Sequence, residues 1–468
     1  MDIRLVDGPP SLISTFFDLG ESGYTAAEYF VSGEATAYEP AGGTGDDGVW
    51  PVRPGRRAPF TTRLVVYRPA DPAAFGGTVV VEWLNVSSGA DAPAGWLTLH
   101  RQLIRDGAAW IGVSAQRDSI DGESLFSRLS STEGDFSSII LPPLKKTDPE
   151  RYAPLDHPGN AFSYDVFAQV GRLARQEGGV LGPLRASRVL AVGQSQSAAH
   201  LVTFVNAVAP VAGGYDGYLI HGRPGRPAFL DGTRWETREG RVQIRTDGGA
   251  PVITLQSETD VAGLLRSAGS RQPDGERFRL WEVAGTAHAD TYTIDAAFRD
   301  SGRRRPDELA AMLAPRSAPL GAEFPLPINS GPQQHYVAQA AIAALDRWVR
   351  TGAPPASADR LGLEPGEPVR LRLDGHGIAT GGVRTPWVDV PVAVLSGLGQ
   401  EAAPGAALLF GSTRPFGAAT LRRLYPRGAD DYLPAFRDAA ERAVAAGFLL
   451  AGDLDEITGL AAASFPAS

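Results

Sequence analysis

The stretch SRVLAVGQSQSAAH, Ser187–His200, decides how the chain folds. Aliphatic residues at Val189–Val192 predict a buried strand, and the small residues after Ser195 predict a helix. Such a strand-to-helix turn is typical of a nucleophile elbow, which usually reads G-x-S-x-G and holds its serine in a strained backbone conformation. Gly193 supplies the first glycine here, but Ser197 replaces the last one. An ordinary turn between a strand and a helix is therefore the alternative interpretation.

Length and composition narrow the class of protein. The chain has 468 residues, 43% of them hydrophobic and 21% charged, as in a globular protein. The net charge of -9 and the lack of a basic block argue against a nucleic-acid partner. We expect no membrane span and a soluble, cytoplasmic protein as the chain stands, with secretion of a trimmed precursor left open. The sequence has no cysteine, and its only lysines, Lys145 and Lys146, are adjacent, so thiolate and Schiff-base chemistry are poor expectations.

Predicted strands and helices alternate along most of the chain. We expect strands at 61–69, 77–85, 108–116, 215–223, 251–260 and 278–290, and helices at 96–107, 162–176 and 335–352. This alternation predicts a mostly parallel central sheet with helices on both faces. Residues 1–58 are rich in glycine and proline and are predicted to be irregular. Their G-x-G-x-x-G pattern, Gly43–Gly48, carries two aspartates and follows no predicted strand, so we interpret it as a loop.

Three long irregular segments, 117–160, 224–250 and 291–330, interrupt the alternation. They carry apolar and aromatic residues, among them Phe136, Ile139, Ile140, Phe229, Trp235, Tyr292 and Phe324. Because each begins near the C-terminal end of a predicted strand, we expect lid or cap insertions. Residues 356–468 contain short β-like pieces and a helix near 436–446. We expect this C-terminal segment to pack on the core of a single domain, 1–468.

A nucleophilic serine needs a histidine base, and the base needs an acid to orient it. Of the seven histidines, His288 follows Ser195 in the loop after a predicted strand, where this fold class places its base. The segment QSETD at the end of strand 251–260 offers Glu258 and Asp260 as the acid. The length of the strand favours Asp260, by analogy with other folds of this class. In an extended chain both side chains would point to the same side, so both carboxylates stay candidates.

The tetrahedral intermediate of acyl transfer needs two main-chain N–H donors for its oxyanion. We expect one from Gln196, the residue after the nucleophile, and the other from Leu84 or Asn85 in the loop after strand 77–85. The residues that we expect to bind substrate around this centre are His221, Arg223, Trp83 and Gln194. We expect no metal and no organic cofactor.

A set of motifs occurs along the chain: VVVEWLNVSSG, GQSQS, QSETDV, WEVAGTAHAD, GGVRTPWVDVP and LLFGSTRPF. In this combination, over roughly residues 60–465, the sequence resembles the bacterial and fungal α/β hydrolase domain-containing proteins. The resemblance implies one α/β-hydrolase fold that includes the C-terminal segment, with Ser195 and His288 at catalytic positions. It does not decide between Glu258 and Asp260, because both lie within QSETDV.

These observations predict a serine hydrolase that cleaves the carboxylic ester of a medium-sized neutral small molecule through an acyl-enzyme. An amidase or a lyase on the same fold, or a non-catalytic small-molecule-binding protein, is the alternative. The apolar insertions favour an uncharged substrate. Arg223 and Arg226 are the contrary signal, because arginine binds carboxylates bidentately. The sequence leaves a homo-oligomer open.

Overall fold

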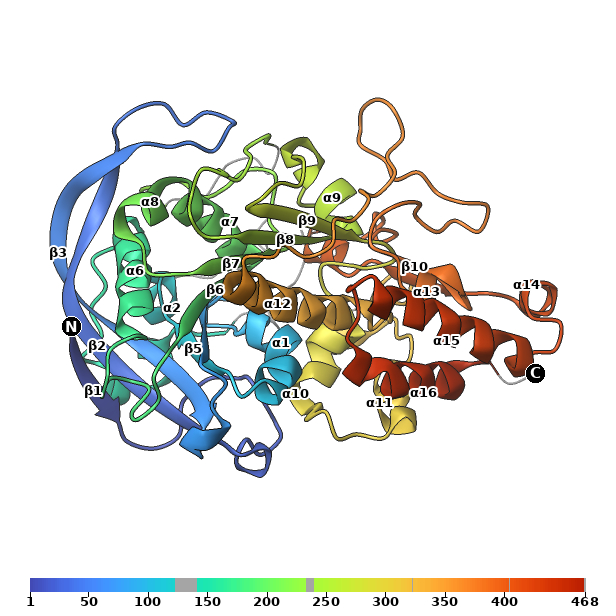
Figure 1. Ribbon diagram of the computed structural model, residues 1–468, viewed down its shortest axis with the longest axis horizontal. Coiled ribbons are helices and arrows are strands. Elements are labelled where there is room, and N and C mark those ends of the chain that lie inside the picture. Colours follow the sequence, from blue (N-terminus) through green and yellow to red (C-terminus); the bar gives the residue numbers. More distant parts are fainter. Residues whose placement is uncertain (123–140, 233–239, 322, 404, 467–468) are drawn as a thin grey trace.

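The computed structural model describes residues 1–122, 141–232, 240–321, 323–403 and 405–466. Its main strands are β1 (Asp2–Val6), β2 (Tyr24–Pro40), β3 (Val52–Pro69), β4 (Thr78–Trp83), β5 (Ala109–Val113), β6 (Arg188–Gln194), β7 (Gly217–His221), β8 (Val252–Ser257) and β9 (Phe278–Val283). They form a nine-stranded sheet in the order β1-β2-β3-β5-β4-β6-β7-β8-β9 (Figure 1). Strands β4 to β9 are parallel, whereas β1, β2 and β3 pair antiparallel at one edge. The predicted mostly parallel sheet is confirmed.

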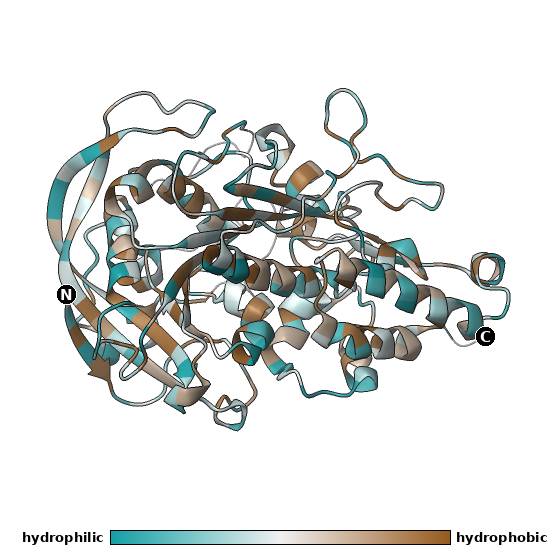
Figure 2. Ribbon diagram, viewed as in Figure 1, coloured by the Kyte–Doolittle hydropathy of each residue, from teal (hydrophilic) through white to brown (hydrophobic). Residues whose placement is uncertain are grey.

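Helices cover both faces of this sheet. One face carries α6 (Ser163–Leu173), α7 (Gln196–Thr203) and α8 (Ala209–Ala212), and the other carries α1 (Ala94–Arg105) and α12 (Gln333–Thr351). Strand β4 shows why: Val79 and Val81 pack with α6 and α7, whereas Val80 packs with α1 and α12. A strand that is buried on both sides needs apolar residues at every position, and Figure 2 shows hydrophobic residues concentrated in the central strands.

The prediction for the N-terminal 58 residues is wrong. Strands β2 and β3 form a long antiparallel hairpin, with Tyr24 opposite Pro69 at one end and Pro40 opposite Val52 at the other. The outer part of the hairpin has few consecutive apolar residues, because one of its sides faces solvent. The two strands are held together by main-chain hydrogen bonds, and hydrophobic periodicity in the sequence does not report such bonds. Gly43–Gly48 lies in the connection between the two strands, as expected for a loop.

The C-terminal segment contains more helix than the sequence indicates. It forms α13 (Pro386–Asp389), α14 (Ala418–Leu424), α15 (Ala429–Ala445) and α16 (Leu454–Ser464), with a small ribbon of β10 (Ala393–Ser396) and β11 (Ser412–Pro415). The β-like pieces at 367–374 and 381–391 give only isolated bridges and α13. Phe436 and Leu460 share a hydrophobic cluster with Leu190 of β6.

A buried ion-pair network also joins this segment to the core. Arg101 of α1 pairs with Asp300 at 3.1 Å and with Glu456 of α16 at 2.7 Å. Helix α16 therefore shares a buried ion pair with a helix that packs on the central sheet, which is not expected of an independently folded unit. These shared contacts support our proposal that residues 1–468 form a single domain.

The insertions follow β5, β7 and β9, at the C-terminal edge of the parallel strands. Their described parts include the short helices α2 (Asp118–Asp121), α4 (Leu144–Thr147), α5 (Pro149–Tyr152), α10 (Ala297–Arg299) and α11 (Pro306–Met312). The predicted lid residues Phe136, Ile139, Ile140 and Trp235 lie outside the described residues, so the lid stays a prediction. Within the described part of the chain, no helix has both the length and the apolar character of a membrane span.

Candidate active site

Ser195 occupies the sharp turn between β6 and α7. Its backbone angles are φ 63° and ψ −119°, and Arg266 is the only other non-glycine residue with positive φ in the described part of the chain. A side chain in this region costs free energy, and such strain concentrates at functional positions. Ser195 is half-buried, whereas Gln194 and Gln196 on either side are buried. The local geometry is therefore that of a nucleophile elbow.

The residues around Ser195 explain how the elbow closes. A Cβ atom on Gly193 would lie 2.9 Å from the carbonyl oxygen of Ser197, so glycine is required there. Ser197 stands where the usual motif has its last glycine. Its hydroxyl donates to the carbonyl oxygen of Gln194 at 2.9 Å and accepts the Gln194 N–H at 3.2 Å. The departure from G-x-S-x-G thus adds a side-chain clamp to the turn.

The structure brings His288 and Asp260 together. Nδ1 of His288 lies 2.6 Å from Oδ1 of Asp260, and both side chains are buried. The other oxygen of Asp260 accepts the N–H of Ser257 at 2.7 Å, because Ser257 and Asp260 form the capping box of α9 (Glu258–Ala262). The carboxylate is therefore fixed on both oxygens and orients the imidazole ring.

Glu258, the other candidate acid, points elsewhere. The expectation that it shares a side with Asp260 fails because the chain turns into helix α9 at this position, where side chains two residues apart diverge by about 200°. Its carboxylate accepts the Gly285 N–H at 2.6 Å, the Gly397 N–H at 2.8 Å and the Ser396 hydroxyl at 3.0 Å. Burial raises the pKa of Glu258 to about 7, although these hydrogen bonds act against the rise.

The turn His221–Gly222 supports the imidazole ring of His288. Gly222 has φ 63°, and a Cβ atom there would lie 2.9 Å from Cε1 of His288. The carbonyl oxygen of His221 accepts the N–H of Ser195 at 2.9 Å. One turn thus contacts both the elbow and the histidine. Burial lowers the pKa of His221 to about 4, the neighbouring His288 acts in the same direction, and Asp260 opposes the change, so His221 is neutral at pH 7.

The two residues expected to supply the second oxyanion donor use their N–H groups elsewhere. Leu84 donates to the carbonyl oxygen of Val113 at 3.2 Å, and Asn85 donates to that of Ala92 at 3.0 Å. The next residue, Val86, makes only a long contact of 3.4 Å from its N–H to Oε1 of Gln196. Val86 is therefore the better candidate, and the sequence could not reveal it because the Asn85–Ala92 bridge is a tertiary feature.

Gln196, the other predicted oxyanion donor, follows Ser195 directly. It is the first residue of α7, where main-chain N–H groups have no partner within the helix. Its side chain donates to Oε1 of Gln116 at 2.8 Å. Trp83 donates to the same oxygen at 3.1 Å. Gln116 thus ties the loop after β5 to the elbow, and no motif in the sequence marks it.

Trp83 and Gln194 lie beneath the elbow. Trp83 is completely buried and packs against Tyr164, Phe167 and the ring of His200, so it belongs to the core. The main-chain oxygen of Gln194 accepts the Asn85 side-chain amide at 3.0 Å. Both residues support the site from within the core, and no described contact marks either as a substrate ligand.

Arg223 is a buried cation that is held by carbonyl groups. Its Nε donates to the oxygen of Pro224 at 3.1 Å, and Nη2 donates to the oxygens of Gly225 and Val242 at 3.1 and 2.8 Å. Burial lowers its pKa to about 10. These bonds tie the second insertion together. Arg226, by contrast, is exposed.

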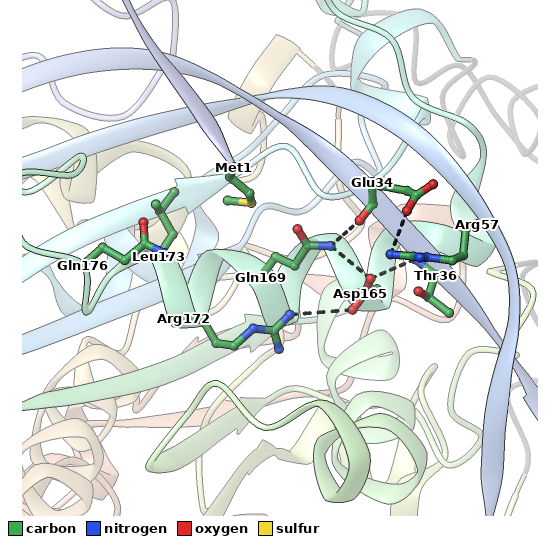
Figure 3. A pocket seen from close by; sticks show the side chains of 9 residues that line it. All are labelled: Met1, Glu34, Thr36, Arg57, Asp165, Gln169, Arg172, Leu173 and Gln176. Atoms are coloured by element: carbon green, nitrogen blue, oxygen red, sulfur yellow. Dashed lines mark hydrogen bonds and ion pairs between the residues drawn. The ribbon is translucent and has the colours of Figure 1, made fainter.

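A cavity of about 440 Å³ lies away from this centre, between the N-terminal hairpin and α6 (Figure 3). Its polar groups satisfy one another. Asp165 accepts the Thr36 N–H at 2.8 Å and the Gln169 amide at 3.0 Å, and Arg57 pairs with Glu34 at 2.7 Å. We therefore do not assign it a function. Within the described residues, no group of histidines and carboxylates is arranged to hold a metal ion.

The mostly parallel sheet, the helices on both faces and the strained serine elbow define the class of the α/β hydrolases. A family model described as "Alpha/beta hydrolase domain" matches residues 5–459, and the chain belongs to this family. The family match confirms the resemblance seen in the motifs. Among curated proteins, no relative matches the chain.

Solved structures of hydrolases are similar at low identity. Fungal esterases from Rhizomucor miehei share 10% identity at a TM-score of 0.33, over 69% of this chain and 85% of theirs. A thermostable esterase from Pseudomonas putida shares 14% identity at a TM-score of 0.32, over 64% and 82%. A putative dienelactone hydrolase from Klebsiella pneumoniae shares 11% identity at a TM-score of 0.26, over 54% and 85%. Similarity at this level says nothing about the substrate of the present chain.

Proposed function

We propose that the protein is a serine hydrolase that cleaves carboxylic esters through a Ser195-His288-Asp260 triad. The observation that carries the proposal is the 2.6 Å contact between His288 and Asp260. The His288 ring packs against the turn His221–Gly222, and the carbonyl oxygen of His221 accepts the Ser195 N–H. A histidine that is oriented by a buried carboxylate, on a turn that also contacts a strained serine, supports the proposal, because acyl transfer uses a serine, a base and an acid in this order.

The reaction proceeds in two halves. His288 takes the proton of the Ser195 hydroxyl, and the oxygen attacks the ester carbonyl carbon. The N–H groups of Gln196 and Val86 donate to the resulting oxyanion. The C–O bond to the alcohol then breaks, and His288 protonates the leaving oxygen. In the second half, His288 deprotonates a water molecule that attacks the acyl-enzyme, and the acid leaves as the proton returns to Ser195. Asp260 keeps Nδ1 of His288 protonated throughout, so that Nε2 serves as the base.

We propose a medium-sized neutral ester as the substrate. Arg223 supports this choice, because its guanidinium group already donates three hydrogen bonds to carbonyl oxygens of the second insertion. Those donors are not available to a substrate carboxylate. Phe229 of the same insertion is an exposed apolar side chain, and we propose it as a contact for the substrate. The comparison of kcat/KM for a neutral ester and its ω-carboxylated analogue tests the choice. A preference for the anion that Arg223→Ala abolishes would contradict it.

The nucleophile is tested with a fluorophosphonate probe and p-nitrophenyl esters. We expect the probe to label Ser195 in the wild type, and Ser195→Ala and His288→Ala to lose about three or more orders of magnitude in kcat. Asp260→Asn should cost up to about 10⁴-fold, because the amide favours the wrong tautomer of the histidine. His376→Ala, in the C-terminal segment, is the control and should keep wild-type activity. Near-full activity of Ser195→Ala would rule out the proposal, and an unlabelled wild type would favour a binding protein.

A further inference from the structure

The loop that carries His288, Gly285–Ala289, is held between two segments that lie far apart in the sequence. On one side lies the junction of β8 and α9, Ser257–Asp260, which we call the acid loop, and on the other lies the C-terminal strand β10 with the residues that follow it. We call Gly285–Ala289 the histidine loop. The position of the base thus depends on contacts that its own strand, β9, does not supply.

Glu258 is the residue that joins all three segments. One carboxylate oxygen accepts the Gly285 N–H of the histidine loop at 2.6 Å. The other accepts the Ser396 hydroxyl at 3.0 Å and the Gly397 N–H at 2.8 Å. The Glu258 N–H also donates to the carbonyl oxygen of Thr286 at 3.2 Å. The side chain is 1% exposed, so the contacts are shielded from water.

Thr259 makes a second connection beside it. Its hydroxyl accepts the main-chain N–H of His288 at 3.2 Å and donates to the carbonyl oxygen of Gly397 at 2.6 Å. Acid loop, base and C-terminal segment therefore share a continuous set of hydrogen bonds. His288 itself makes two hydrogen bonds to the acid loop. Its ring is bonded to Asp260, and its main-chain N–H donates to the Thr259 hydroxyl.

The backbones at this junction are in close contact. A Cβ atom on Gly397 would lie 2.5 Å from the nitrogen of Thr259 and 2.5 Å from the oxygen of Thr286. The main-chain N–H of Ala289 donates to the oxygen of Leu409, also from the C-terminal segment, at 3.0 Å. A junction packed this tightly transmits a displacement of one segment to the others.

From these contacts we infer that Glu258 is a positioning residue, which holds the histidine loop against the acid loop and the C-terminal strand so that His288 stays aligned with Asp260. The inference rests on the proposed serine hydrolase function. It makes the segment after residue 390 part of the catalytic apparatus, although that segment contributes no group to the triad.

The chemistry of the junction requires two acceptor oxygens on residue 258. Its three hydrogen-bonding partners are two main-chain N–H groups and a hydroxyl, which all donate to Glu258, so two acceptor oxygens are needed. In Glu258→Gln, an NH₂ group replaces one oxygen and faces a donor. Either the Gly285 contact or the Gly397 contact is then lost, and the histidine loop shifts.

The experiment compares Glu258→Gln with Glu282→Gln. Glu282, on β9, is also buried. It accepts the Leu361 N–H of the C-terminal segment at 2.8 Å and pairs with Arg271 at 2.6 Å, and none of its described hydrogen bonds goes to the histidine loop. Two readouts are measured on folded full-length protein: kcat and KM for a p-nitrophenyl ester, and the downfield proton resonance of the His288 Nδ1–H, assigned with Asp260→Asn. The resonance does not depend on esterase activity.

We expect Glu258→Gln to lower kcat by about 10- to 100-fold with KM changed less than about threefold, and to shift or broaden the resonance, as for a base displaced by a fraction of an ångström. Glu282→Gln should keep both within about twofold. A folded Glu258→Gln with wild-type kcat and resonance would overturn the inference, and so would an equal loss of kcat in Glu282→Gln.

Two further outcomes are decided by the same measurements. If the wild type is neither active nor labelled, the proposed function fails, and the resonance alone decides the inference: a change in Glu258→Gln supports it and no change overturns it. If Glu258→Gln does not fold, Thr259→Val replaces it, since valine has nearly the same shape and lacks only the bridging hydroxyl. We then expect a three- to tenfold loss of kcat, about the effect of a smaller displacement, and an unchanged kcat would contradict the inference.

Discussion

Gly222 provides the sharpest test of the active-site geometry, because its lack of a side chain leaves room for the His288 ring. In Gly222→Ala, the new Cβ would lie 2.9 Å from Cε1 and 3.1 Å from Nδ1 of His288. Carbon atoms in contact prefer a separation of about 3.5–4.0 Å, so the ring must move by roughly half an ångström or more. That movement breaks the 2.6 Å contact between Nδ1 and Asp260.

The magnitude follows from two separate effects. The positive φ of 63° costs an alanine about 1–2 kcal/mol, which lowers Tm by a few degrees at most. The displaced ring should lower kcat by about 10- to 100-fold, because a shift of about 1 Å in a catalytic group costs about 10²-fold. KM should change far less, since no substrate contact is removed.

The assay is ester hydrolysis with active-site titration of Ser195, together with thermal unfolding. Gly352→Ala is the matched control, because Gly352 has φ 73° and no atom within 4 Å of the added Cβ. It should lose only about 1–2 kcal/mol, which is what positive φ costs an alanine, and keep full activity. A Gly222→Ala enzyme with wild-type kcat would refute the packing of His288 on this turn.

Further predictions concern strain, pH dependence and the anchoring of the C-terminal segment. Ser195→Gly should be more stable than Ser195→Ala by about 1 kcal/mol or more in urea unfolding, because glycine adopts positive φ without strain; the usual order, with alanine more stable, would contradict the strained elbow. Burial lowers the pKa of His157 to about 4, so between pH 6.5 and 4 the unfolded state binds more protons and stability falls as the pH is lowered. Between pH 7 and 5, His157→Gln should therefore lose about 2 kcal/mol less unfolding free energy than the wild type, and an equal loss would exclude the effect. Arg101→Met should cost about 3–5 kcal/mol, because it leaves two carboxylates without their buried cation. Arg437→Met, which removes an exposed pair, should change stability by less than about 0.5 kcal/mol, and similar values for both arginine variants would argue against a buried network.

The sequence by itself determined the alternation of strands and helices, the elbow at Ser195 and the loop that carries His288. These features are encoded locally: apolar periodicity reports which side of an element is buried, and small residues report a close turn. The same reasoning failed for β1 and the outer part of the β2–β3 hairpin, where main-chain pairing replaces a continuous apolar pattern.

Only the tertiary structure separated the two carboxylates. In the sequence, Glu258 and Asp260 differ by two positions and look equivalent, but both lie in the first turn of helix α9, which sends their side chains in different directions. Asp260 reaches His288, 28 residues away in the chain, whereas Glu258 reaches Ser396 at a separation of 138 residues. The long contact of the Val86 N–H with Gln196 and the carbonyl partners of Arg223 depend on similar contacts. Hydrogen bonds between distant segments follow from how the folded chain brings its loops together, and no local pattern of residues records them.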